Sequence, residues 1–436
     1  MSPIIAGLVG TGVMFLLLFL GMPIALALML VGFLGLGYLA SIEAALPVAA
    51  STLYHVAAHY PYTVIPLFIV MGGFASSGGL TTELYQTFDK WFRKLPGGLG
   101  AATIGACAGF AAVSGSSVAT AAAMGTIALP EMKRFKYSPR LATGTIAAGG
   151  TLGFLIPPSI GFVVYGMLTE QSIGKLLIAG MFPGIILAAG YIAIVISLVK
   201  LNPSLAPTSP EAVSWKERLL ALRGVWETLL IFMLVMGGIY LGWFTPTEAG
   251  AIGATTLFLV ALVKGRLTLQ NLFASIQEAI RVSVMVLFLV AGATVFSYFL
   301  ALSTIPMQVA VWVAGLEVSR YVILILILVI YIFLGCFIDA ISMMVLTLPV
   351  IYPVILGLGF HPIWFGVIAV LMMEAGLITP PMGLNVYTIA GVAKDTPVEE
   401  IFRGALPFLI SIVVIVVVIT AFPQIALFLP GKMLGG

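Results

Sequence analysis

Long apolar segments with very few charged residues between them are the feature that most limits how this chain can fold. Of its 436 residues, 61% are hydrophobic and only 8% are Asp, Glu, Lys or Arg. A soluble globular protein has about 25% charged residues, and it could not hide so much apolar surface from water. The composition excludes a soluble enzyme, a secreted domain, a disordered protein and a nucleic-acid-binding protein. It predicts a polytopic membrane protein with roughly ten to fourteen crossings or half-crossings.

The apolar segments favour helices, because they are continuous and do not alternate as the strands of a membrane β-barrel would. Cys107 and Cys336 lie inside such segments, so no disulfide framework is expected. The first basic side chain is Lys90 and the first apolar stretch covers 3–40. A cleavable signal peptide, which has a basic start and a short apolar region, is therefore not expected.

The two halves of the chain repeat the same motif. Ile-Pro-Pro-Ser at 156–159 and Thr-Pro-Pro-Met at 379–382 each follow a Gly-containing apolar segment. Each is followed by Gly-x-x-Pro, which begins at Gly180 in the first half and at Gly404 in the second. The second proline precedes that glycine by 22 and 23 residues, respectively. Internal repeats of this kind are typical of secondary transporters.

Basic residues predict that the two repeats are inverted. The loops flanking 99–130 contain seven Lys and Arg residues, whereas Arg320 is the only one in the loops flanking 321–356. Cytoplasmic loops are enriched in Lys and Arg. We therefore expect equivalent elements to enter the membrane from opposite sides.

Segments 99–130 and 321–356 are predicted to be re-entrant helical hairpins, because both ends of each segment are expected on one side. Each arm of about 15 residues would reach roughly 22 Å, which is less than the ~30 Å hydrocarbon core. The first midpoint is the Ser- and Gly-rich stretch 113–117. The second contains Asp339, the only charged residue of its segment, and function is the default expectation for such a residue.

The Pro-Pro pairs predict that 141–168 and 362–392 are broken helices, because proline removes amide donors and clashes with the preceding turn. Opened backbone at membrane depth is tolerated where it lines a cavity or binds an ion. Free carbonyls and hydroxyls suit Na⁺, and free amides at helix N-termini suit a carboxylate. The predicted fold is an all-α polytopic membrane protein of two inverted repeats, each with a re-entrant hairpin and a Pro-broken helix.

Five parts of the chain are expected: N-terminal scaffold helices with an amphipathic interfacial arm helix (1–98), a first transport repeat (99–199), a cytoplasmic linker (200–224), a second scaffold part with its arm (225–320) and a second transport repeat (321–436). The remaining ionisable residues leave alternatives open. Glu374 could serve function or a structural pair, and His55 and His59 are expected to be loop or interface residues.

An intramembrane serine hydrolase is a remote alternative, suggested by Ala-Val-Ser-Gly at 112–115. A nucleophilic serine needs a neighbouring base. The three histidines, His55, His59 and His361, lie outside the predicted mid-membrane segments, so an enzyme is not expected.

Four ordered motifs make this chain similar to a known family. They are Ser-Gly-Ser-Ser-Val-Ala at 114–119 with Pro-Glu-Met at 130–132, Leu-Ile-Pro-Pro-Ser-Ile at 155–160, Gly-Cys-Phe-Ile-Asp-Ala-Ile-Ser-Met at 335–343 and Gly-Leu-Ile-Thr-Pro-Pro-Met-Gly at 376–383. Together they resemble the large membrane subunit of tripartite ATP-independent periplasmic (TRAP) transporters, elevator-type carriers of the ion transporter superfamily. The similarity covers nearly the whole chain.

The resemblance implies uptake of an organic acid anion, such as a C4-dicarboxylate or sialic acid, driven by Na⁺ across the bacterial inner membrane. It also implies two partners, a small four-helix membrane subunit and a soluble periplasmic substrate-binding protein, and no cofactor or metal other than Na⁺ as coupling ion. A stand-alone sodium/dicarboxylate carrier of the same superfamily is the alternative, and it would need no binding protein.

The resemblance also assigns residues to sites. It places one Na⁺ at Ser114, Gly115, Ser116, Thr120, Gly150 and Thr151, and a second at Gly335, Asp339, Ser342, Gly376 and Thr379. It places the substrate near Ser117, Pro158, Ser159 and Asn385. Family members often have Asp where this chain has Thr120, and Gly where it has Lys136. Thr120 offers an oxygen, but the first sodium site has one formal charge fewer.

Overall fold

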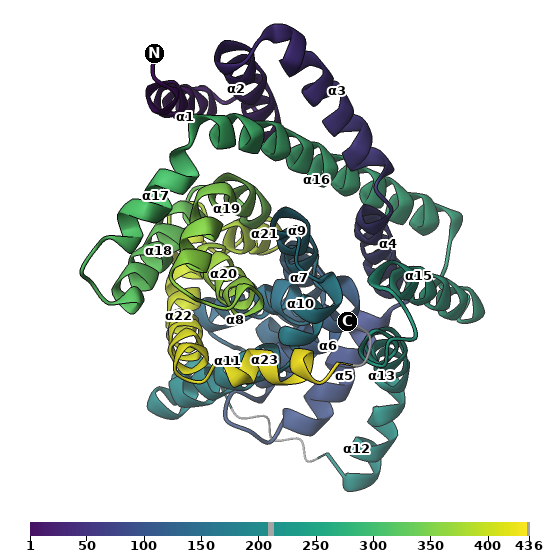
Figure 1. Ribbon diagram of the computed structural model, residues 1–436. Helices are drawn as coiled ribbons and strands as arrows, with labels where there is room; N and C mark the ends of the chain where they lie inside the picture. The colour runs from purple at the N-terminus through teal and green to yellow at the C-terminus, as the bar shows by residue number, and fades with distance from the viewer. Residues whose placement is uncertain (208–212, 434–436) are drawn as a thin grey trace.

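The computed structural model describes residues 1–207 and 213–433, and these residues form helices and no strands. Residues 208–212 of the predicted linker lie outside the described part. Helices α1–α5 and α12–α17 form an outer group that borders a central group of α6–α11 and α18–α23 (Figure 1).

The outer group begins with five helices and continues after the first repeat. Its members are α1 (Pro3–Phe19), α2 (Ile24–Leu39), α3 (Ile42–Ala58), α4 (Val64–Ser77), α5 (Leu80–Phe92), α12 (Trp215–Ala221), α13 (Trp226–Phe232), α14 (Gly238–Tyr240), α15 (Pro246–Val263), α16 (Leu269–Ser303) and α17 (Ile305–Ala314). A π-helical turn, Met233–Gly237, joins α13 to α14. Gly21 (φ +85°) and Pro23 separate α1 from α2.

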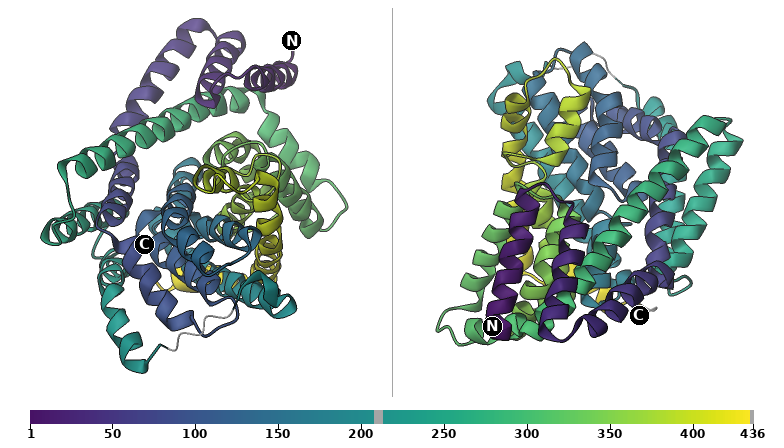
Figure 2. Two further views of the ribbon diagram at one scale, coloured as in Figure 1. Left: turned by 180° about the vertical axis from the view of Figure 1, so that it is seen from behind. Right: turned by 90° about the horizontal axis from the view of Figure 1, so that it is seen from above.

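Helix α16 organises the outer group. It is 35 residues long, about 52 Å at 1.5 Å per residue, and it packs along α2 and α4. From the central group α19 packs against it, and Figure 2 shows it crossing beside that group in both views. The described residues contain six helices long and apolar enough to cross a membrane, or up to eight if each bent pair is one span.

The central group holds the two repeats. The first consists of α6 (Gly98–Ser114), α7 (Ser117–Arg134), α8 (Pro139–Leu155), α9 (Ile160–Thr169), α10 (Ile173–Ala179) and α11 (Met181–Leu201). The second consists of α18 (Arg320–Gly335), α19 (Ala340–Gly357), α20 (Pro362–Gly376), α21 (Leu384–Val392), α22 (Val398–Ala421) and α23 (Gln424–Gly431). This confirms the predicted all-helical fold with two hairpins, α6–α7 and α18–α19, and two helices broken at Pro-Pro.

An offset of 223 residues relates the two repeats from the hairpins to the Pro-Pro pairs. This offset relates the starts of the broken helices, Pro139 and Pro362, and the Pro-Pro pairs at 157–158 and 380–381. It also relates the N-cap residues of the second hairpin arms, Ser116 and Asp339. Each hairpin tip therefore faces an equivalent break in its own repeat.

Part of the predicted linker is a helix. Ser214 and Glu217 form a capping box that starts α12, since each side chain bonds the other's backbone amide. Helix α12 then packs against the amphipathic arm helix α5, where Trp91 Nε1 donates to the Arg218 carbonyl. The sequence predicted a linker here, because the stretch is polar and rich in proline. Its helix depends on packing against α5, which the local sequence does not show.

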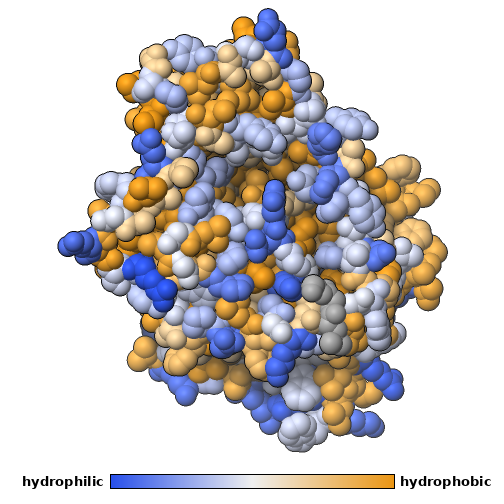
Figure 3. All heavy atoms as spheres, viewed as in Figure 1, coloured by the Kyte–Doolittle hydropathy of each residue, from blue (hydrophilic) through white to orange (hydrophobic). Residues whose placement is uncertain are grey.

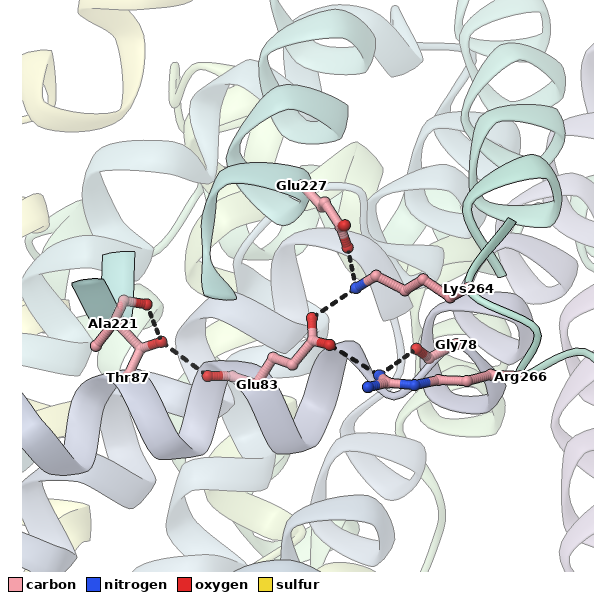
Figure 4. A network of polar contacts seen from close by, with 7 residues as sticks. All are labelled: Gly78, Glu83, Thr87, Ala221, Glu227, Lys264 and Arg266. Atoms are coloured by element: carbon pink, nitrogen blue, oxygen red, sulfur yellow. Dashed lines mark hydrogen bonds and ion pairs between the residues drawn. The ribbon is translucent and has the colours of Figure 1, made fainter. Parts of the chain in front are cut away.

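Charged side chains fasten α5 to the end of α15 (Figure 4). Glu83 of α5 lies 2.7 Å from Lys264 Nζ and 2.8 Å from Arg266 Nη1. Lys264 also contacts Glu227 of α13 at 2.5 Å, and Arg266 donates to the Gly78 carbonyl. A network of partly buried charges with several bonds per group is stronger than isolated surface pairs.

The surface agrees with a membrane setting. In Figure 3 hydrophobic residues cover much of the upper part of the molecule, over α1–α3, and polar side chains spread across the middle and lower parts. Phe19 of α1 is 88% exposed and Val263 of α15 is 87% exposed. Water does not tolerate such surfaces over large areas, whereas lipid does.

Candidate functional site

Hairpin tip 1 is a two-residue turn between α6 and α7. Gly115 adopts the left-handed conformation (φ +66°), which glycine takes without a steric penalty. Ser116 then caps α7, because its side chain accepts from the Ala119 amide. A Cβ at Gly115 would lie 2.7 Å from the carbonyl oxygen of Pro158, which lies in the break between α8 and α9. Only glycine therefore lets the tip approach this break, called break 1, so closely.

Hydroxyl groups gather at tip 1. Ser114 Oγ and Thr120 Oγ1 are 2.9 Å apart, and Thr120 Oγ1 donates to the Ser116 carbonyl at 2.8 Å. Ser114 and Thr120 are both buried. The Thr120 hydroxyl thus holds the turn of the tip together, and it adds an oxygen but no charge.

Break 1 separates α8 from α9, which are bent by 42° relative to each other. Ser159 bridges it: its hydroxyl donates to the Phe154 carbonyl of α8 and accepts from the Phe162 amide of α9. Tip 1 is attached to the same break, because the Ile160 amide donates to the Gly115 carbonyl at 3.3 Å. Predicted residues of both the sodium and substrate sets therefore meet here.

Hairpin tip 2 consists of Gly335, the last residue of α18, and the four residues that follow it before Ala340. Asp339 caps α19, since its Oδ2 accepts from the Ser342 amide at 3.1 Å. The Cys336 carbonyl accepts from the Met382 amide at 3.0 Å, which attaches tip 2 to break 2 as tip 1 is attached to break 1.

Break 2 separates α20 from α21. Gly376 at the end of α20 packs directly on Gly335 of tip 2, where a Cβ on Gly376 would lie 2.6 Å from the Gly335 Cα. Thr379 Oγ1 donates to the Ala375 carbonyl at 2.6 Å. The Asn385 amide reaches back across the break to the Leu377 carbonyl at 3.1 Å.

Side chains from the two repeats meet at the centre. Ser117 Oγ, at the start of α7, donates to Glu374 Oε1 of α20 at 2.8 Å. Asn385 Nδ2, at the start of α21, donates to the Ala147 carbonyl of α8 at 3.2 Å. Ser117, Glu374 and Asn385 have no exposed surface. Glu374 Oε2 and Asn385 Oδ1 lack hydrogen-bond partners among the described residues.

Gly150 and Thr151 of α8 lie beside this centre and contact different helices. A Cβ on Gly150 would lie 3.0 Å from Asn385 Nδ2 and 3.1 Å from the Ser117 carbonyl oxygen. The Thr151 hydroxyl donates to the Ala148 carbonyl and lies 2.8 Å from the Tyr191 hydroxyl of α11. The side chain of Thr151 is therefore engaged by α11, and Gly150 is the one of the pair that lies against the start of α7, next to tip 1.

Each tip borders a cavity. A cavity of about 150 Å³ at tip 1 is lined by Ser114 and Ser116 and, from the outer group, by Ser76 of α4 and Glu278 of α16. A cavity of about 410 Å³ at tip 2 is lined by Gly335, Asp339, Leu377, Gly383 and Tyr387, among others. The first has room for roughly five water molecules, at about 30 Å³ each, and the second lies within the size range of small-molecule pockets.

The structure brings most predicted site residues to the two tip–break junctions. Sequence reasoning left Glu374 undecided and missed Tyr191, which is fully buried against Thr151. The 223-residue offset was the available signal for Glu374, because it makes Glu374 the counterpart of Thr151.

The chemistry of the junctions favours hard cations and carboxylates. Backbone carbonyls, hydroxyls and one carboxylate are the ligands that such cations prefer. Among the described residues, no group of three or more His, Cys, Asp or Glu is placed to hold a metal ion. Ser114 Oγ is hydrogen-bonded to Thr120 Oγ1, and His361 Nδ1 accepts from the Ile363 amide at the start of α20.

Comparison with known proteins gives matches along the chain. Residues 11–425 match the family described as "Tripartite ATP-independent periplasmic transporter, DctM component". The chain is 37% identical to the C4-dicarboxylate TRAP transporter large permease protein DctM of Pseudomonas aeruginosa, over 87% of this chain and 88% of that protein. It is 32% identical to the sialic acid TRAP transporter large permease protein SiaM of Vibrio cholerae, over 96% and 97%.

The fold also resembles a solved structure. The Alcanivorax borkumensis YdaH transporter superposes with a TM-score of 0.60 at 16% identity, covering 88% of this chain and 89% of that one. At this identity the similarity concerns the fold.

Proposed function

This chain belongs to the DctM component family of tripartite ATP-independent periplasmic transporters, and from that premise we propose that it imports an organic acid anion together with Na⁺. The anion is delivered by a periplasmic substrate-binding protein, and a small four-helix membrane subunit completes the complex in the bacterial inner membrane. Relatives named for C4-dicarboxylate and for sialic acid support an organic anion as the substrate class.

The observation that carries sodium coupling is the pairing of each hairpin tip with a broken helix. Each pair brings opened backbone and side-chain oxygens together, at Gly115 with Ile160 in the buried interior and at Cys336 with the more exposed Met382. Opened backbone without a water or ligand partner is costly in a membrane. Bound Na⁺ at each junction would take backbone carbonyl and hydroxyl oxygens as ligands.

Charge accounting favours at least two Na⁺ per dianion. Moving a dianion into a cell at −100 mV costs about 4.6 kcal/mol, at about 2.3 kcal/mol per charge. One Na⁺ would leave a net negative charge moving against the potential. Two would cancel the charge, and the structure offers two junctions.

The proposed transport step is an elevator movement of the central group against the outer group. Tip and break are bonded to each other within the central group, whereas α4 and α16 line a cavity beside tip 1, and Gly72 of α4 packs against Ser114 at the end of α6. The bonded junctions can therefore travel intact, and the contacts that must change lie at the outer group.

The test is reconstitution of the chain in liposomes with its cognate small subunit and binding protein. We expect accumulation of a labelled C4-dicarboxylate or sialic acid only under an inward Na⁺ gradient, with an equal choline gradient as the control. Net inward positive charge should accompany uptake if a third Na⁺ is moved.

Two outcomes would contradict the proposal separately. Robust uptake by the large chain alone would identify a stand-alone carrier. Uptake that proceeds equally in choline would exclude sodium as the coupling ion, whatever the partners are.

A further inference from the structure

A buried carboxyl group joins the two repeats. Glu374 Oε1 accepts from Ser117 Oγ, and neither side chain has exposed surface. Ser117 begins the second arm of hairpin 1, directly after the cap Ser116, and Glu374 lies two residues before Gly376, which packs on tip 2. The hydrogen bond therefore connects the residue next to one candidate sodium site with the helix end of the other.

Stability does not explain this arrangement. Within the described part of the chain, Glu374 forms no ion pair and its Oε2 has no hydrogen-bond partner. Burying such a group costs more than one hydrogen bond from a hydroxyl returns. A carboxyl group retained at membrane depth at that cost indicates function.

A second cross-repeat bond flanks the same break. Asn385 follows break 2 and donates to the Ala147 carbonyl of α8. Break 2 is thus held to repeat 1 on both sides, by Glu374 before it and by Asn385 after it. Gly150 fits between the two links, within contact distance of Asn385 and Ser117.

We propose that Ser117 and Glu374 couple the two candidate sodium sites, an inference that rests on the proposed function. An ion at tip 1 fixes the start of α7, and Ser117 then holds Glu374 and the end of α20 where Gly376 meets tip 2. Occupation of either site thereby raises the affinity of the other, since coupling between sites is reciprocal. Glu374 is a positioning residue in this scheme and not an ion ligand.

The experiment is equilibrium binding of ²²Na⁺ to the purified chain, without substrate or partner proteins. Wild type should bind two ions with a Hill coefficient above 1. Ser117→Ala removes only the donor, and Glu374→Leu removes the acceptor while filling its space. Both should still bind two ions, with a Hill coefficient near 1 and a half-saturating concentration raised at least about 5-fold.

Two further variants separate coupling from a general effect on folding. Glu374→Gln keeps an oxygen that can accept from Ser117, so it should retain the wild-type Hill coefficient. Thr347→Val is the matched control, because it removes a buried hydroxyl whose bonds, to Tyr331 and Met343, stay within hairpin 2. It should leave sodium binding unchanged.

Each contrary outcome has its own meaning. If wild type binds fewer than two ions, the proposed sodium sites are wrong and the coupling falls with them. If wild type binds two ions and Ser117→Ala has the same Hill coefficient as wild type, the proposed coupling is wrong but the two sodium sites are not. A drop to one ion in Glu374→Leu would show that Glu374 is a ligand, which also overturns the proposal.

Discussion

Replacing Asp339 by Asn separates its charge from its role as a helix cap. In the structure Asp339 Oδ2 accepts from the Ser342 amide and so starts α19. Asn ranks with Asp as an N-cap residue. The hairpin should therefore keep its shape in Asp339→Asn, and the negative charge at tip 2 is the only large loss.

The size of the effect follows from the surroundings of that charge. At about 4 Å, a carboxylate and a cation attract by about 4 kcal/mol at an effective dielectric constant of 20 and by about 1 kcal/mol in bulk water. Asp339 is half-buried and lines a cavity that is partly open. We therefore expect a loss of about 1–2 kcal/mol, which raises the half-saturating Na⁺ concentration roughly 5- to 30-fold.

The assay is the initial rate of uptake against external Na⁺, with substrate and binding protein saturating. Asp395→Asn is the matched control, because Asp395 is an exposed carboxylate paired with Lys133 in the loop after α21. That ammonium group holds the pKa of Asp395 below its ordinary value, so the control also removes a full charge. An unchanged sodium curve for Asp339→Asn would exclude this residue from coupling.

Three other predictions address orientation and packing. Cysteines at Lys94 and Lys136 should react with an impermeant thiol reagent only from the cytoplasm and one at Gly359 only from the periplasm; labelling of all three from one side would refute the inverted orientation. Lys264→Met leaves the partly buried carboxylates of Glu83 and Glu227 without the ammonium group between them. It should lower the stability by about 1–2 kcal/mol, measured as a lower thermal midpoint in detergent. An unchanged midpoint would show that this network does not hold α5 in place. Gly144→Ala would place a Cβ 2.1 Å from the Gly404 backbone, so we expect loss of the monodisperse peak in size-exclusion chromatography, and normal assembly would contradict this close helix contact.

The sequence was sufficient to predict the breaks, because local backbone chemistry determines them. Proline cannot donate an amide hydrogen, and Gly115 takes a left-handed conformation that other residues rarely adopt. Asp339, which the sequence placed at a hairpin midpoint, is the N-cap of α19. These features depend on a few neighbouring residues, so one chain suffices to find them.

Helices that depend on contacts with distant parts of the chain were harder to predict from the sequence. Helix α3 was not identified, because Glu43, Pro47 and His55 interrupt its apolar pattern. Helix α17 was missed as well, and α16 is longer at both ends than its apolar core predicts. Helix α3 packs against α2 and α16, and α17 packs mainly against α19 of the central group. Hydropathy does not report such distant contacts.

In the candidate site, too, local features could be predicted and distant contacts could not. The residues at each tip and break could be named from motifs, but not which hydroxyl turns toward which partner. Thr151 was predicted beside tip 1, and its hydroxyl instead meets Tyr191, forty residues further along the chain. The roles of individual predicted ligands stay predictions, since a side-chain direction depends on packing that no motif specifies.

The bonds between tips and breaks bear on how an ion site can cross a membrane. In repeat 1 the amide of Ile160, two residues after Pro158, donates to the tip carbonyl of Gly115. In repeat 2 the amide of Met382, directly after Pro381, donates to the tip carbonyl of Cys336. Each hairpin thus accepts one hydrogen bond from an amide just after its own proline pair. A site made of two bonded parts of one repeat keeps its geometry while its surroundings change, because the groups that define it move together. A site shared with α4 or α16 would lose ligands at every step, so the proposed elevator movement requires the tip–break pairing that the structure shows.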